Sequence, residues 1–552
     1  MLMAVVTFSL KDLKDSGISI EALKDLVPRI GMEIEAASED EVAIDITPNR
    51  PDLLDFTGLI RALNFFSEKK VPKENGYTLK DSKAVEISVT KNVSKIRPYI
   101  VGLVARKVDL SGDKLKYLIN FTEKLSDTYG RKRMKFSTGI YNLDLIKGNL
   151  TYDAAKDKPF APLGFQNEMG FSEILEKHPK GIAYGSIVKD STGNIPFLSD
   201  SEKVLSMIPI TNSESTKVTN ATKNLFIDVT GTSLASVQQV ANLLACSLLD
   251  SGAEVSQCMI KYDDSEMLSP RLEAKEVQVK GTKISKTLGI AIDLGDAITM
   301  ANKMGHSAAR YGNTLLVKVP PYRLDVLNDQ DIIEDLAIGY GYDNISPLPI
   351  MGFSDGLPEE LREFTDSVAL FMVGSGFSEA LNTYLTNERI NSESMRRAYK
   401  KGETVGIAYA KTENITMLRT DILPCLLKSL SYSAHEKMPQ KLFEIGSVFS
   451  MDNSKPLESH HLAFVSEHSK ADFSEAKSTV LAILNNLGIR DLEIKKFDDK
   501  AFIEGRCAQV ASKGRHVAVF GELHPAVLSN FNLEEPTIGA EVTLIDRITY
   551  GA

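Results

Sequence analysis

The sequence predicts a multidomain α+β protein. Short strand-like apolar runs alternate with amphipathic helical segments along the whole chain. The 552 residues exceed what a single hydrophobic core organises, so three or four domains are expected. The hydrophobic fraction of 43% and the charged fraction of 25% are ordinary for a globular protein, and no internal repeat or low-complexity tract is visible.

The first segment is expected to be a small mixed α/β domain. A strand at VVTFSL precedes a helix that begins near Ser19, and two more strands follow at GMEIEAA and EVAIDITP. Pro48 and Pro51 set a rigid turn, after which Asp52 is expected to cap an amphipathic helix. The polar stretch from Ser67 to Lys83 is typical of a linker.

Three further units follow the linker. The second contains the strand-like runs EISVT, YIVGLVARKV and LFIDVTGT and the long apolar helix that begins LASVQQVANLLACSLL. The third starts after Ser269-Pro270 and contains the strand LLVKVPPYRLDV and the helix DIIEDLAIGYGY. From about Ile350, strands and helices alternate again to the C-terminus.

Cysteine spacing and hydropathy place the chain in the cytoplasm. The four cysteines are scattered without CxxC spacing, which argues against a zinc site and against a disulfide framework: Cys246, Cys258, Cys425 and Cys507. The N-terminus lacks the pattern of a signal peptide, and no run reaches the ~18 apolar residues of a membrane helix. We therefore expect a soluble, unexported protein without a membrane partner.

The net charge of −10 argues against a surface coated with phosphate-binding residues. It does not exclude nucleic acid, because affinity follows local basic patches. One such patch is Arg131-Lys132-Arg133 with Lys135. Sequence alone leaves two interpretations open, a nucleic-acid contact and a solvated turn after a helix.

An acidic cluster stands out in the third unit. Asp331, Glu334 and Asp335 are spaced i, i+3 and i+4, so they share one face of the expected helix, and Asp325 lies six residues upstream. The cluster could serve a helix N-terminus, form a solvated acidic face, or bind Mg²⁺, which prefers hard oxygen ligands.

The segment from Tyr322-Arg323-Leu324-Asp325 to Gly339-Tyr340-Gly341-Tyr342 resembles a signature of phenylalanyl-tRNA synthetase β subunits of the archaeal/eukaryotic type. The resemblance covers nearly the whole chain and includes MEIE, PNRPD, HPKG, FIDVTGT and GELHP. It implies that the four acidic positions hold Mg²⁺: Asp325, Asp331, Glu334 and Asp335.

The same resemblance implies four domains. These are a B1-like domain over residues 1–85, an editing domain of B3/B4 type over 86–265, a small α+β B5-type domain over 266–350, and a class II synthetase-like antiparallel sheet with helices over 351–552. It places four residues at the editing pocket: Leu198, Ser206, Asp228 and Thr230. From the residues alone, the Asp228 segment could equally be a strand end before a helix capped by Thr232 or Ser233.

The resemblance implies a role within a larger ligase. The C-terminal domain is expected to be catalytically silent, with Arg419 structural, while ATP is used by the holoenzyme and bound mainly on a catalytic α subunit. The expected partners are that α subunit, in an (αβ)₂ heterotetramer, and tRNA(Phe). The alternatives are a free-standing trans-editing hydrolase and a scaffold subunit without editing activity.

Proofreading is expected because a phenylalanine pocket discriminates poorly against tyrosine. An apolar phenylalanine pocket rejects a substrate with one added hydroxyl by only roughly 10²-fold. A second site that offers polar partners to that hydroxyl can hydrolyse the mischarged Tyr-tRNA(Phe). No Ser-His-Asp or Cys-His pattern is required, because a positioned water and the terminal ribose hydroxyl can suffice.

Overall fold

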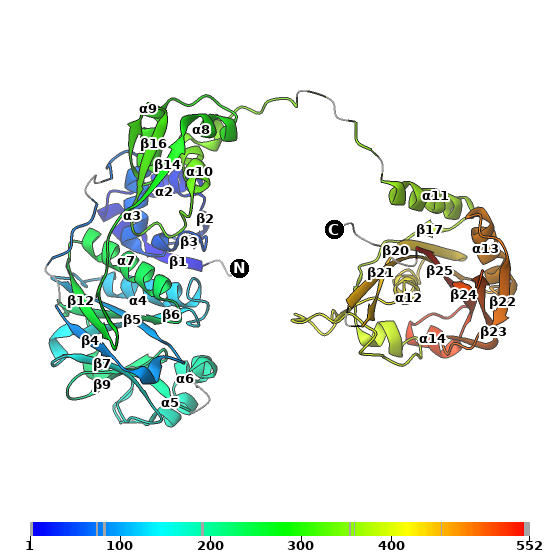
Figure 1. Cartoon of the computed structure of the whole chain (residues 1–552), viewed down its shortest axis with the longest axis horizontal. Helices are drawn as coiled ribbons and strands as arrows, with labels where there is room; N and C mark the ends of the chain where they lie inside the picture. Colours follow the sequence, from blue (N-terminus) through cyan, green and yellow to red (C-terminus); the bar gives the residue numbers. More distant parts are fainter. Residues whose placement is uncertain are drawn as a thin grey trace. The chain divides into compact units, whose positions relative to one another are not determined.

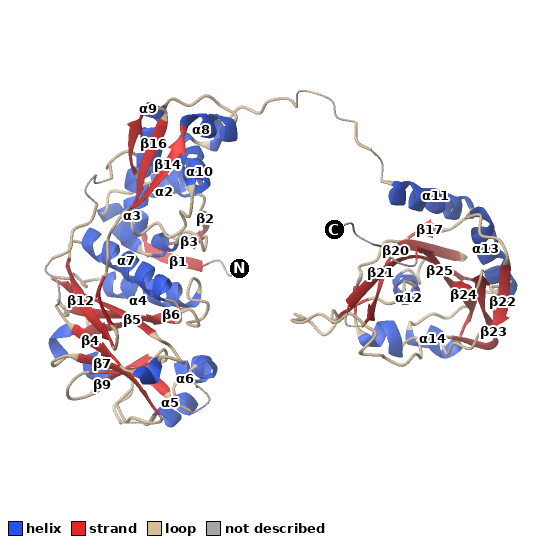
Figure 2. Ribbon diagram, in the orientation of Figure 1, coloured by secondary structure: helices blue, strands red, loops and turns tan. Residues whose placement is uncertain are grey.

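The computed structural model describes residues 4–72, 76–80, 84–188, 193–350, 352, 355–357, 359–453 and 455–545. Contacts divide the chain into two compact units, Met1–Pro349 and Ile350–Ala552 (Figure 1). Each unit combines sheets with helices (Figure 2), so the predicted multidomain α+β class is confirmed. The division into four domains stays a prediction. None of the described helices is long and apolar enough to cross a membrane.

The first unit begins with a three-stranded antiparallel sheet in the order β1-β3-β2 and three helices. Their bounds are β1 (Ala4–Ser9), α1 (Leu10–Asp15), α2 (Ile20–Arg29), β2 (Glu33–Ala37), β3 (Glu41–Ile46) and α3 (Phe56–Phe66). Ser19 caps α2 as expected, since its hydroxyl accepts from the Ala22 amide at 3.2 Å.

The expected cap of α3 was wrong by three residues. Asp55, not Asp52, caps this helix by accepting from the Gly58 amide at 3.0 Å. Asp52 is buried and instead receives two hydrogen bonds from Arg50, at 2.9 and 2.8 Å. Asp52 lies inside a short 3-10 turn, Pro51–Leu54, and α3 begins only after this turn, which explains the shift.

A ten-stranded mixed sheet forms the middle of the first unit. Its strand order is β10-β9-β8-β7-β4-β12-β5-β11-β6, with β13 paired to β12. The strands are β4 (Glu86–Val89), β5 (Tyr99–Arg106), β6 (Phe136–Asn142), β7 (Leu150–Ala155), β8 (Ile195–Ser199), β9 (Val204–Met207), β10 (Thr211–Asn212), β11 (Leu225–Gly231), β12 (Glu254–Tyr262) and β13 (Ser265–Ser269). The helices are α4 (Lys114–Asp127), α5 (Phe171–Lys177), α6 (Pro179–Tyr184) and α7 (Leu234–Asp250).

The helices α4 and α7 join this sheet to the N-terminal sheet. Their apolar side chains share one buried cluster with Phe8 of β1 and with Leu225, Ile227 and Val229 of β11. Side chains alternate along a strand, so the neighbouring β11 residues Phe226, Asp228 and Thr230 face the other way. The helices thus occupy one face and leave polar residues on the opposite one.

The first unit ends with a small α+β segment. The antiparallel sheet has the order β14-β16-β15 and packs on three helices. The bounds are β14 (Lys275–Lys280), α8 (Gly281–Leu288), α9 (Leu294–Lys303), β15 (Ser307–Tyr311), β16 (Thr314–Val319) and α10 (Asp329–Tyr340).

The second unit is built on a seven-stranded sheet in the order β17-β20-β21-β25-β24-β23-β22. All its pairs are antiparallel except β17 with β20. Helices α11 and α13 contribute to the core on one face, and α12 and α14 to the core on the other. The bounds are α11 (Glu360–Gly374), β17 (Ser378–Glu379), β18 (Leu385–Thr386), β19 (Met417–Leu418), α12 (Leu423–Tyr432), β20 (Gln440–Asp452), β21 (Lys455–Glu467), α13 (Phe473–Asn486), β22 (Leu492–Lys496), β23 (Phe502–Ser512), β24 (Arg515–Leu523), α14 (Pro525–Asn530) and β25 (Thr537–Ile545).

Candidate functional site

A cavity of about 320 Å³ opens at the β6 edge of the ten-stranded sheet. It is lined from α4, β6, β11 and the segment that spans β9 and β10. Strands β6 and β11 are antiparallel neighbours, and three cross-strand pairs share one face of the sheet: Ser137 with Thr230, Gly139 with Asp228, and Tyr141 with Phe226.

Asp228 places a buried carboxyl group at this cavity, with 2% of the residue exposed. The Tyr141 hydroxyl donates to Asp228 Oδ2 at 2.6 Å, and its oxygen lies 2.8 Å from Ser206 Oγ. Burial raises the pKa of Asp228 to about 7, although the Tyr141 hydrogen bond and the Arg97 charge oppose the shift. The site therefore holds a buried acceptor that is partly ionised near neutral pH.

Gly139 makes the Asp228–Tyr141 contact possible. A Cβ atom at position 139 would lie 2.5 Å from both Asp228 Oδ2 and the Tyr141 hydroxyl oxygen. A side chain at this position would thus have to displace the two groups that form the hydrogen bond. The glycine is needed here for close approach.

Arg97 is buried beside the Ser137–Thr230 pair, with 5% of the residue exposed. Its Nε donates to Thr230 Oγ1 at 3.1 Å, and its Nη2 donates to Ser137 Oγ at 3.2 Å and to the Thr230 carbonyl oxygen at 2.8 Å. Its Nη1 donates to the Arg133 carbonyl oxygen at 3.1 Å. Within the described ranges it forms no salt bridge, so its charge is held by neutral oxygens.

The structure separates the four residues predicted for the editing pocket. Ser206 and Asp228 line the cavity. Thr230 lies one layer deeper, fully buried against Arg97 and Ser137. Leu198 pairs with Ser206 across β8 and β9 and belongs to the apolar core. Sequence reasoning missed Tyr141 and Arg97, although the period-two pattern of Ser137, Gly139 and Tyr141 marks one face of a strand.

Two of the four acidic residues predicted to bind Mg²⁺, Asp325 and Asp335, form ion pairs with Arg323. Arg323 donates to both oxygens of Asp325, at 2.9 and 2.7 Å, and to Asp335 Oδ2 at 2.6 Å. His306 Nε2 also lies 2.6 Å from Asp335 Oδ2. Burial opposes ionisation here, but the Arg323 charge holds the pKa of Asp335 down to about 2. A metal cation would therefore have to compete with the Arg323 guanidinium for the Asp325 and Asp335 carboxylates.

The other two acidic side chains do not complete a metal site. Asp331 Oδ2 accepts from the Leu327 and Asn328 amides, at 2.7 and 2.8 Å, and closes a capping box at the start of α10. Glu334 is exposed. No three His, Cys, Asp or Glu side chains in the described part of the chain are grouped to hold a metal ion. The predicted magnesium site is thus not formed by this chain alone, because the helix-cap role and Arg323 use its carboxylates.

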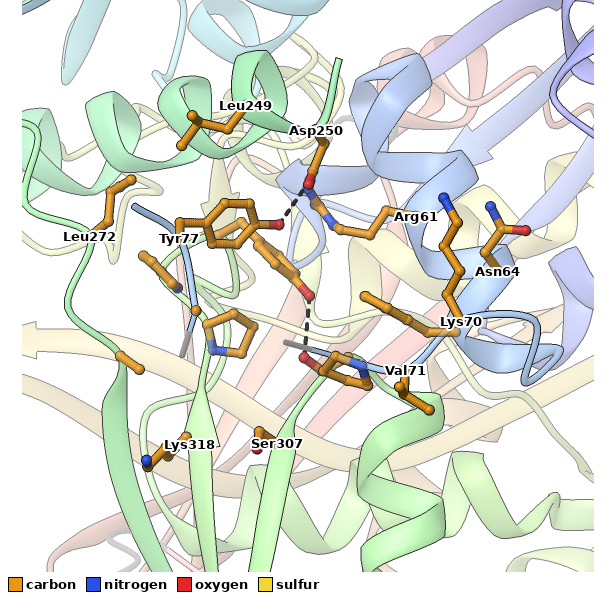
Figure 3. Close-up of a pocket in the computed structure, with 18 of the residues that line it drawn as sticks. Arg61, Asn64, Lys70, Val71, Tyr77, Leu249, Asp250, Leu272, Ser307 and Lys318 are labelled. Atoms are coloured by element: carbon orange, nitrogen blue, oxygen red, sulfur yellow. Dashed lines mark hydrogen bonds and ion pairs between the residues drawn. The ribbon is translucent and has the colours of Figure 1, made fainter. Parts of the chain in front are cut away.

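A larger cavity of about 600 Å³ lies between α3, the end of α7 and the β14–β16 sheet. Figure 3 shows Arg61 and Tyr77 converging on Asp250, with N–O and O–O distances of 2.6 and 2.8 Å. The Arg61 guanidinium also stacks on the Tyr322 ring at 3.5 Å. Because its buried charges are paired with each other, this cavity is a weaker candidate than the one at Asp228.

Comparisons with known proteins identify the family of the chain. Residues 83–248 match the B3/4 domain family, residues 277–342 match the tRNA synthetase B5 domain family, and residues 346–544 match the phenylalanyl tRNA synthetase beta chain CLM domain family. The phenylalanine–tRNA ligase beta subunit of Archaeoglobus fulgidus is 37% identical over 98% of both chains. The chain belongs to the phenylalanine–tRNA ligase beta subunit family. It is therefore a subunit of an aminoacyl-tRNA synthetase.

Other members of the family are similar to the chain over comparable lengths. The beta subunit of Pyrococcus horikoshii is 35% identical over 97% of both chains. The crystal structure of an N-terminal fragment of the Pyrococcus horikoshii beta subunit superposes with a TM-score of 0.58 at 35% identity. It covers 61% of this chain and 99% of the fragment. The cavity at Asp228 lies within the residues that match the B3/4 domain, which is consistent with editing.

In the segment that matches the CLM domain, Arg419 has the structural surroundings that the sequence predicts. It is fully buried, donates to Glu444 Oε1 at 2.6 Å and to the Ser447 carbonyl oxygen at 2.9 Å, and lies over the Tyr384 ring. The side chain is thus held inside the domain by a buried ion pair.

The basic cluster after α4 combines a turn with a buried arginine. Arg131, Lys132 and Arg133 have φ of 52°, 52° and 66°, a left-handed turn that costs roughly 1 kcal/mol or more per residue. Arg133 faces the cavity wall, where it donates to Glu123 at 2.7 Å and to the Pro209 carbonyl oxygen at 2.8 Å. Arg131 and Lys132 are exposed, so the turn interpretation describes them, and a nucleic-acid contact stays a prediction.

Proposed function

We propose that the chain is the tRNA-binding and proofreading subunit of a phenylalanine–tRNA ligase, and that the cavity at Asp228 hydrolyses mischarged Tyr-tRNA(Phe). The observation that carries this proposal is the buried Asp228–Tyr141 pair in the wall of a cavity within the B3/4 domain match. A phenol hydroxyl can donate a hydrogen bond to the Asp228 carboxyl group, whereas an apolar side chain cannot.

Recognition rests on the unpaired capacity of Asp228. Tyr141 uses Oδ2, and no described residue donates a hydrogen bond to Oδ1. A tyrosyl hydroxyl that entered the cavity would donate to this second oxygen. A phenylalanyl group would cover the same carboxyl without donating a hydrogen bond to it, which leaves a buried acceptor unpaired. Sites of this kind reject the analogue that lacks the hydroxyl by about 10⁴-fold.

Hydrolysis needs a water near the ester rather than a protein nucleophile. The water oxygen adds to the ester carbonyl carbon, the bond from that carbon to the ribose oxygen breaks, and the ribose oxygen takes up a proton. The groups that line the cavity supply hydrogen bonds for this step, and the terminal ribose hydroxyl can assist it. The lining also includes Lys180 and Lys217, which form ion pairs with Glu123 and Glu214. A tRNA 3′ end would exchange these ion pairs for contacts with its phosphates.

The other half of the proposal concerns partners. We assign aminoacylation to a separate α chain, with ATP and its Mg²⁺ bound mainly there, in an (αβ)₂ heterotetramer that binds tRNA(Phe). Support comes from the family itself, whose members are beta subunits, and from Arg419, which is buried in an ion pair instead of opening to a ligand.

Deacylation of Tyr-tRNA(Phe) by the assembled ligase tests the editing proposal. The parent is expected to release tyrosine, and Asp228→Ala to release it at least 10²-fold more slowly, because the hydroxyl loses its charged acceptor. Asp113→Ala, which removes an exposed carboxylate from the same domain, serves as the matched control and should behave as the parent. Equal rates for the parent and Asp228→Ala would disprove the pocket assignment.

A further inference from the structure

The Ser137–Thr230 end of the cavity has hydrogen-bond chemistry that recognition of a phenol leaves unused. Ser137 lines the cavity, whereas Thr230 is fully buried behind it. The two hydroxyl oxygens lie 3.1 Å apart, and Arg97 donates to each of them. No other described group hydrogen-bonds to either hydroxyl, so the direction of both protons follows from these contacts.

Counting donors and acceptors fixes where the protons point. Each hydroxyl has one proton. Because Arg97 donates to both oxygens, neither proton can be directed at Arg97. One proton lies between Ser137 and Thr230, and the other needs a further acceptor. If that proton belonged to Thr230 it would be buried without a partner, so Thr230 donates to Ser137 and the Ser137 proton faces the cavity.

The charge of Arg97 strengthens this arrangement. Burial lowers the pKa of Arg97 to about 10, so the guanidinium stays charged at neutral pH. A hydrogen bond from a charged donor polarises the hydroxyl that accepts it. Ser137 Oγ accepts from both Arg97 and Thr230, which also makes it a poor nucleophile.

The distance between the two ends of the cavity matches the substrate. Asp228 and Thr230 are two residues apart on β11, which corresponds to about 7 Å along a strand. This is comparable to the length of a tyrosyl side chain from its α-carbon to its hydroxyl. A tyrosyl group bound with its phenol at Asp228 and its long axis along β11 would place the ester carbonyl near Ser137.

We propose that Ser137 donates a hydrogen bond to the ester carbonyl oxygen of the bound aminoacyl-tRNA, with Arg97 as the positioning residue that orients the Ser137 and Thr230 hydroxyls. The bond strengthens as water adds to the carbonyl carbon and negative charge develops on that oxygen. The proposal rests on the editing function above. It adds a second polar group, which acts on the ester and not on the side chain of the amino acid.

Single-turnover deacylation by the assembled ligase tests this role. Loss of one such donor typically lowers the rate 10²- to 10³-fold. Ser137→Ala should therefore lower the maximal deacylation rate of Tyr-tRNA(Phe) by about this factor, with little change in the concentration needed for half-maximal rate. Arg97→Met should lower it similarly, and Arg97→Lys should restore part of the rate, because a charged donor is returned. Residual hydrolysis of Phe-tRNA(Phe) should fall with that of Tyr-tRNA(Phe), so their ratio stays constant.

The outcomes separate this inference from the editing proposal. A parent ligase that deacylates neither ester would overturn both. A parent that deacylates, together with a Ser137→Ala variant of equal rate, would overturn only the role of Ser137. Aminoacylation and thermal unfolding of each variant report folding. If Ser137→Ala unfolds, the near-isosteric Ser137→Cys takes its place, because a thiol is a weak donor, and parental rates in that variant would count against the proposal.

Discussion

The raised pKa of Asp228, a residue of the proposed editing site, makes the stability of the protein depend on pH. Its folded pKa of about 7 lies above the ordinary value of 3.8, so the folded state retains a proton that the unfolded chain releases in between. The free energy of unfolding therefore falls as pH rises from about 4 to about 7, and this contribution is constant above that range.

Asp228→Asn removes this titration and keeps an acceptor for Tyr141. The variant should be more stable than the parent by roughly 2–4 kcal/mol at pH 8, and by clearly less at pH 5. Denaturant unfolding at the two pH values measures the difference, with Asp113→Asn as an exposed control. A stability difference that does not change with pH would contradict the buried, protonated Asp228.

At the scale of single residues, the sequence predicts only part of the site. It found Asp228 and Ser206, which line the cavity, because they stand in motifs that resemble the family. It missed Tyr141, because the contact joins β6 to β11 across 87 residues of sequence. Pairing between distant strands depends on the whole sheet, and local propensity contains no information about it.

At the scale of secondary-structure elements, a buried charge network holds two of the four acidic residues predicted to bind Mg²⁺, Asp325 and Asp335. As their helical spacing predicts, Asp331, Glu334 and Asp335 all lie on α10, and Asp331 caps the N-terminus of this helix. Arg323 lies in the same motif, two residues before Asp325, but its direction toward α9 and α10 follows from the loop after β16 and not from spacing.

Arg323→Ala tests this network. The change leaves Asp325 and Asp335 without their counterion beside His306, and removing one partner of a buried ion pair costs about 3–5 kcal/mol. Arg310→Ala, on the exposed strand β15, should change stability by less than about 0.5 kcal/mol. Thermal unfolding compares the two, and equal melting temperatures would show that the network contributes nothing.

On the scale of the whole molecule, the sequence predicts a fold class and an assembly with a second chain, and the structure of this chain tests only the fold class. The α+β class followed from alternating strand and helix patterns, whereas the sheet orders did not, because β4, β7 and β12 pair across long separations. The assembly with an α chain is a statement about a second polypeptide, and neither unit of this chain contains it.

Purification from the native source tests the proposed assembly. A tag on this chain should retain a second, different polypeptide in equal amount, and the native mass should correspond to two copies of each. The expectation follows from the beta-subunit family. Recovery of this chain alone, active in deacylation, would favour a free-standing hydrolase.

The proposed editing site selects the hydroxyl of tyrosine through the buried carboxyl group of Asp228. This selectivity is tested most directly by the deacylation rates of Tyr-tRNA(Phe) and Phe-tRNA(Phe) with the same parental ligase. Since only the tyrosyl hydroxyl can pair with Asp228 Oδ1, we expect the tyrosyl ester to be hydrolysed at least 10²-fold faster, and the ratio of the two rates to fall toward one in Asp228→Ala. Equal hydrolysis of both esters by the parent would contradict it.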